Sequence, residues 1–164
     1  MATSSTKVKA THRDVFFHFL AMCTLYISAI SLTVVLFQII NISFPDPVSD
    51  YYSAGDHYKG LLRTGLSFLI VMFPVMVYAL RILHTSYKDR ADARGLSIRK
   101  TITYVTLFVV SFIIMFTLVF VLNQFFDGEL TSRFALKATS SLLVAGAIFW
   151  YYRLELRDIQ QASK

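Results

Sequence analysis

Charged residues are scarce in this chain of 164 residues, of which Asp, Glu, Lys and Arg together make up 16%. A soluble domain is roughly 25% charged, so these side chains cannot cover a water-soluble globule of this size. Residues 15–42 and 101–126 contain no charged residue at all. The scarcity excludes a soluble enzyme, a nucleic-acid-binding module and a disordered tail.

Signatures of catalysis are missing as well. The single cysteine, Cys23, can form neither an intrachain disulfide nor a cysteine metal site, and we expect it to be a small buried hydrophobe. The chain has no nucleophile elbow and no phosphate-binding loop, and no acidic residue lies inside an apolar run. These absences disfavour an enzyme, and we expect no cofactor and no metal site.

The chain is rich instead in apolar sequence, with 55% hydrophobic residues and a mean hydropathy of +0.57. Uncharged apolar runs longer than about 18 residues are typical of transmembrane helices, which satisfy their own backbone hydrogen bonds in lipid. We therefore predict an all-α fold, a four-helix transmembrane bundle that forms a single membrane domain over 1–164. Its spans cover about 15–42, 61–83 with a cytoplasmic extension to about 94, 98–126 and 133–153.

The connection between the third and fourth spans is short. Asp127 and Gly128 end the third span, and Thr131 or Ser132 can cap the fourth. So short a connection predicts an antiparallel hairpin.

Basic residues gather on one side of this topology. Twelve of the sixteen Lys and Arg residues lie in 1–14, 81–100 and 153–164. The other four, which are mixed with acidic residues on the opposite side, are Lys59, Arg63, Arg133 and Lys137. Cytoplasmic loops are enriched in Lys and Arg, so both termini should be cytoplasmic.

Ionisable residues near the outer ends of the spans are the first candidates for a functional site. Lys137 lies inside the fourth span, and an unpaired charge at mid-membrane costs at least ~2.5 kcal/mol. Two interpretations stay open. One is an ion-pair network that ties the outer loops together, with Lys137 reaching outward to its partners; the other is a vestibule that attracts anions. The candidate residues are Arg63, Arg133, Lys137, Asp56, Asp127 and Glu129.

Two histidines, His18 and His84, lie near the cytoplasmic ends of the first and second spans. Histidines on facing helices can hold a haem axially in a bundle. Such a pair needs matching depths in the membrane, whereas His84 lies beyond Arg81. We expect His18 to form hydrogen bonds within the bundle or to reach toward the interface.

Helix shape and packing provide the remaining candidates. Pro74, central in the second span, removes one helix hydrogen bond and predicts a kink that serves packing or gating. Residues 108–120 carry Phe at every fourth position, a ridge that we expect to pack or to face lipid. The fourth span has small residues at three- and four-residue spacing, which allow close helix approach within the bundle or to a neighbouring subunit. They are Ala138, Ser141, Ala145 and Gly146.

Several short stretches of the chain are distinctive. They are residues 16–19 and 25–31, the segment Phe44-Pro45-Asp46-Pro47, Phe73-Pro74, Gly128-Glu129-Leu130, and residues 151–157. In these stretches the chain resembles an uncharacterised bacterial family of four-span integral membrane proteins, a domain of unknown function, over about residues 14–157. The resemblance implies a bacterial source and a multi-pass protein of the plasma (inner) membrane. It implies no activity.

These observations favour a polytopic membrane protein that is a non-catalytic oligomeric component or the small subunit of a membrane complex. Its expected partners are the lipid bilayer and either a second copy of the chain or another membrane protein, with no nucleic acid. One alternative is a small oligomeric channel or transporter with an outer basic vestibule. A more distant alternative is a haem-binding electron-transfer protein.

Overall fold

The computed structural model of the protein describes residues 12–44, 55–89, 97–128 and 131–161. Within these ranges the chain forms four helices: α1 (His12–Ser43), α3 (Gly55–Asp89), α4 (Ser97–Phe126) and α5 (Ser132–Gln161). Each helix is long and apolar enough to cross a membrane. The all-α class and the four-helix membrane architecture predicted from the sequence are confirmed. The end of the predicted extension, at residues 90–94, lies outside the described residues.

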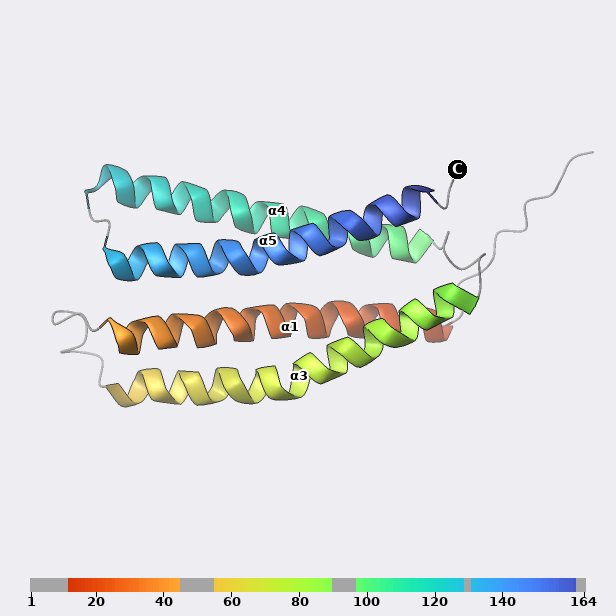
Figure 1. Cartoon of the computed structure of the whole chain (residues 1–164), viewed down its shortest axis with the longest axis horizontal. Coiled ribbons are helices and arrows are strands. Elements are labelled where there is room, and N and C mark those ends of the chain that lie inside the picture. Colours follow the sequence, from red (N-terminus) through yellow and green to blue (C-terminus); the bar gives the residue numbers. More distant parts are fainter. Residues whose placement is uncertain (1–11, 45–54, 90–96, 129–130, 162–164) are drawn as a thin grey trace, which may run out of the picture.

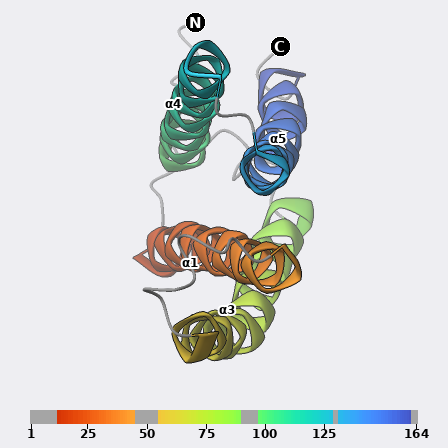
Figure 2. The ribbon, with the colours of Figure 1, turned by 90° about the vertical axis from the view of Figure 1, so that its left-hand side faces the viewer.

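The helices run up and down in sequence order (Figure 1). α1 begins and α5 ends at what we call the termini end of the bundle. At the opposite end, the loop end, α1 and α4 finish and α3 and α5 start. Figure 2 shows α1 lying between α3 on one side and the pair of α4 and α5 on the other. α1 is the most covered helix, since 33% of its most apolar stretch is buried within the chain, against 6–11% in the others.

The pairing of α1 with α3 depends on small residues at two levels. Near the termini end, Ala21 of α1 packs in a buried cluster with Ala79 and Leu83 of α3. Toward the loop end, a Cβ atom placed on Gly65 would lie 3.0 Å from a methyl group of Val35. Small residues let helix backbones approach closely in lipid, so these positions set the distance between the two helices.

Pro74 lies inside α3, near its middle. Figure 1 shows α3 bending about halfway along its length, so that its second half leans across α1. This course fits the kink expected of a proline that removes a backbone hydrogen bond. The half of α3 that follows the bend is the half that packs on α1 through Leu83.

The hairpin between α4 and α5 is built from local signals. Gly128 has a positive φ of 72°, a conformation that glycine adopts readily after a helix, and its N–H donates to the carbonyl of Phe125 at 3.2 Å. The Thr131 hydroxyl accepts a hydrogen bond from the Phe134 N–H at 3.2 Å, the geometry of an N-cap. The predicted turn and its threonine cap are confirmed. The rings of Phe120 on α4 and Phe134 on α5 then pack against each other, with their centroids 6.1 Å apart.

The outward face of α4 is an aromatic ridge. Phe108, Phe112, Phe116 and Phe120 are all exposed on the outside of the chain, and the first three rings follow one another at 4.7 and 6.1 Å. Exposed apolar side chains of this kind suit a lipid environment. Cys23 on α1 is half-buried rather than fully buried.

Candidate functional site

Polar side chains are buried along the whole of α1, although most of this helix is apolar. They are His18, Thr24, Ser28, Ser31, Gln38 and Asn41. Some are satisfied locally: the Thr24 hydroxyl donates to the carbonyl of Leu20 at 2.7 Å. The hydroxyl oxygen of Ser28, in contrast, is buried with no hydrogen-bond partner among the described residues. Buried polar groups in a membrane bundle mark positions where helices are tied together or a function resides.

At the loop end, Arg133 of α5 caps the C-terminus of α1. Its Nη2 atom donates to the backbone carbonyl of Asn41 at 2.8 Å, and its guanidinium lies over the ring of Tyr58, 5.8 Å from the centroid. The Asn41 side chain in turn donates to Gln38 Oε1 at 3.0 Å. The last carbonyls of a helix lack partners within the helix, and a cation there interacts favourably with the helix dipole. Arg133 therefore joins α5 to the C-terminus of α1 and to the start of α3.

Lys137 lies one turn further into α5 and is half-buried. Its Nζ atom lies over the ring of Phe37 on α1, 5.9 Å from the centroid. Such a cation–π contact places the ammonium against α1. The structure thus brings two of the predicted basic residues, Arg133 and Lys137, into contact with the same end of α1.

The other members of the predicted outer cluster are placed differently. Arg63 is exposed near the start of α3, and Asp127 is exposed just after α4. The side chain of Asp56 and the whole of Glu129 lie outside the described residues. The hydrogen bond and ring contacts described above join Arg133 and Lys137 to α1 and to Tyr58.

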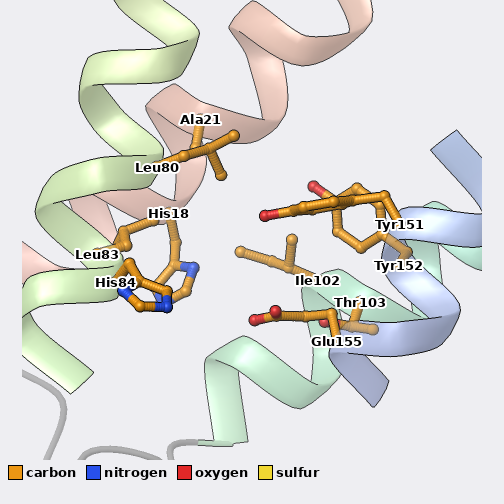
Figure 3. Close-up of a pocket in the computed structure, with 10 residues that line it drawn as sticks. All are labelled: His18, Ala21, Leu80, Leu83, His84, Ile102, Thr103, Tyr151, Tyr152 and Glu155. Carbon is orange, nitrogen blue, oxygen red and sulfur yellow. The ribbon is translucent and has the colours of Figure 1, made fainter. Parts of the chain in front are cut away.

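At the termini end, the four helices surround a small cavity of about 60 Å³ (Figure 3). His18 and His84 form one wall, from α1 and α3, while Tyr151, Tyr152 and Glu155 reach in from α5 on the opposite side. His18 is buried, at 7% exposure. On the α4 side, Thr103 lines the cavity. About one helical turn further along α4, the Thr106 hydroxyl oxygen accepts a hydrogen bond from the Tyr26 hydroxyl of α1 at 3.3 Å.

The two histidines, which the sequence places at different depths, therefore line one cavity, because the bend in α3 carries its second half over α1 (Figure 1). The cavity does not fit a haem: ligand pockets are roughly 300–1,000 Å³, several times its volume. No group of three His, Cys, Asp or Glu side chains within the described ranges could hold a metal ion. The sequence interpretation missed Glu155 and the tyrosines as neighbours of His18. Glu155 follows the two tyrosines by four and three residues, which places the three side chains toward one side of α5, but this spacing does not indicate which helix that side meets.

A second and larger hollow runs along the middle of the bundle. It is a groove of about 510 Å³ between α1, α4 and α5, lined almost entirely by apolar side chains. We call it the α1–α5 groove. Two of the predicted small residues, Ser141 and Ala145, lie on its α5 wall. The other two, Ala138 and Gly146, are half-buried, and a Cβ atom on Gly146 would meet nothing within 4 Å.

These features define a class of protein: a multi-pass integral membrane protein whose four helices are each able to span the bilayer. The chain belongs to the family described as domain of unknown function DUF5671, whose model matches residues 14–152. That match covers most of all four helices and confirms the resemblance to an uncharacterised family. Searches of curated proteins and of solved structures found no match to the chain.

Proposed function

We propose that this chain is a non-catalytic component of a bacterial plasma membrane that associates with a second copy of itself through α5. One observation carries the proposal. α5 has the lowest mean hydropathy of the four helices and is also the least covered, with only 6% of its apolar stretch buried in the chain. A helix of moderate hydropathy gains more from contact with another helix, through packing and polar contacts, than from contact with lipid.

The uncovered face of α5 has the spacing of a helix-packing stripe. Six of its exposed residues recur at intervals of three and four, the spacing at which one face of a helix packs against a facing helix. They are Leu136, Thr139, Leu143, Ala147, Trp150 and Leu154. We call this set the α5 stripe. Gly146 lies beside it, and the open space around this glycine permits a close approach by a neighbouring chain.

Substitution of Gly146 by leucine tests the proposal. A Cβ atom at this position meets nothing within 4 Å in its own chain, so Gly146→Leu should leave the monomer folded while blocking the close approach. We expect the wild-type chain to run as a dimer or larger oligomer in nanodiscs, by mass photometry or light scattering, and Gly146→Leu to shift it toward the monomer. Gly60→Leu is the matched control, because Gly60 on α3 is also open, and it should not change the mass.

A monomeric wild-type chain, or a Gly146→Leu variant with unchanged mass, would contradict self-association through α5. Stoichiometric recovery of a different membrane protein with the wild-type chain, together with a monomeric purified chain, would favour the small-subunit interpretation instead.

The alternative of an oligomeric anion channel stays a prediction. Arg133 and Lys137 supply positive charge at the loop end, but in a single chain the path inward from them is the apolar α1–α5 groove. Anion flux into liposomes, compared between wild type and the variants Lys137→Ala and Arg63→Ala, tests this alternative.

A further inference from the structure

The α1–α5 groove is open at the side, toward the space that lipid occupies. Ile30 on α1 is 64% exposed, and Val105 and Ile113 on the α4 wall are also exposed. On α1 the lining runs from Met22 to Phe37, which corresponds to about 22 Å of helix at 1.5 Å per residue. The hydrocarbon core is about 30 Å thick, so the groove is long enough to receive an extended acyl chain from one leaflet.

A positively charged side chain lies at the loop end of the groove. Phe37, the lining residue of α1 nearest the loop end, carries the ammonium of Lys137 over its ring. Arg133 follows one turn further out, bound to the end of α1. None of the residues that line the groove is Lys, Arg, His, Asp or Glu. The described residues thus combine the long, apolar α1–α5 groove with a cation at its loop end.

This pairing matches the two parts of an anionic phospholipid. Apolar contact alone would suit a neighbouring helix as well as an acyl chain. The ammonium at the mouth is complementary in charge to a lipid phosphate and favours the lipid, because basic residues close to anionic headgroups strengthen lipid binding. The long stem of Lys137 allows its ammonium to reach toward the headgroup level.

We propose that the α1–α5 groove and Lys137 form a binding site for one anionic phospholipid from the leaflet at the loop end. One acyl chain lies along α1, beside Ser141 and Ala145 of α5, and the phosphate meets the Lys137 ammonium. Arg133 remains on the Asn41 carbonyl and borders the headgroup. The site is on a different face of α5 from the α5 stripe, so it is independent of self-association.

Native mass spectrometry of the full chain released from detergent tests the site. We expect one phosphatidylglycerol to remain bound per chain, with phosphatidylcholine bound more weakly. Lys137→Ala should weaken phosphatidylglycerol binding about fivefold and leave phosphatidylcholine unaffected. Arg63→Ala, an exposed arginine on α3, is the matched control and should change neither. Soluble glycerol phosphate should not compete, because it has no acyl chain.

A second variant tests the groove separately from the charge. Ser141→Leu places a larger apolar side chain in the lining and should reduce binding of both lipids, and far-UV circular dichroism reports whether the helices persist. If Ser141→Leu perturbs folding, Ile30→Phe at the exposed rim replaces it. Equal binding of the two lipids in wild type, or full binding in the groove variants, would overturn the proposal. Loss of a dimer in Ser141→Leu, with lipid binding unchanged, would assign the groove to a second copy and would overturn it as well.

Discussion

At the scale of single residues, Gly65 controls how closely α3 approaches α1. A Cβ atom there would lie 3.0 Å from Val35 and 3.5 Å from the Ser31 carbonyl oxygen. Contacts this short leave no room for a larger side chain, because membrane helices that meet at a glycine lie nearly backbone to backbone. Gly60, five residues earlier on the same helix, has open space around it.

We expect Gly65→Leu to destabilise the protein by about 1–3 kcal/mol relative to Gly60→Leu, the usual cost of overpacking a well-filled contact. Both changes replace glycine by the same helix-favouring residue, so the comparison isolates the contact with α1. Unfolding by a graded mixture of mild detergent and SDS measures the difference. Equal stabilities of the two variants would show that α1 and α3 do not meet at this point.

Arg133 acts at the same scale on the end of a neighbouring helix. Its bond to the Asn41 carbonyl is charge-assisted, and it satisfies one of the carbonyls that the helix leaves without an internal partner. We expect Arg133→Ala to lower the free energy of unfolding by about 1–2 kcal/mol and Arg63→Ala to change it little. Hydrogen exchange localises the effect: peptides from residues 36–44 should exchange faster in Arg133→Ala. Unchanged exchange there would contradict the role of Arg133 as a cap of α1.

At the scale of the helices, hydropathy predicts the existence of each element but not its neighbours. The uncharged runs 15–42 and 101–126 identify α1 and α4 because lipid demands long apolar helices. Local chemistry also places the α4–α5 turn, since Gly128 and Thr131 act through their own backbone. The pairing of helices is a different matter, because apolar side chains surround a membrane helix whether it faces lipid or protein.

In the candidate site, too, the sequence predicts which residues matter but not which residues they contact. Arg133 and Lys137 are recognisable as candidates because a charge near lipid is unusual. Their contacts with Asn41 and Phe37 depend on the fact that α5 lies against α1, which no residue pattern indicates. The meeting of His18 with His84 depends in addition on the bend of α3, whose direction Pro74 alone does not specify. A proline predicts that a helix bends, and the surrounding packing decides where it goes.

At the scale of the whole molecule, four apolar helices of this length predict a chain that crosses a membrane four times. The described helices support this topology by length and composition, and their alternating directions bring the start of α1 and the end of α5 to the same end (Figure 1). The concentration of Lys and Arg in residues 1–14, 81–100 and 153–164 predicts that this end is cytoplasmic.

Reporters fused at Asp56 and at Ala93 test the four-span topology. Alkaline phosphatase is active only outside the cytoplasm and green fluorescent protein is fluorescent mainly inside it, so each position is assayed with both. We expect phosphatase activity at Asp56 and fluorescence at Ala93, with α3 crossing the bilayer between them. If both positions report the same compartment, α3 does not span the membrane and the four-span bundle is wrong.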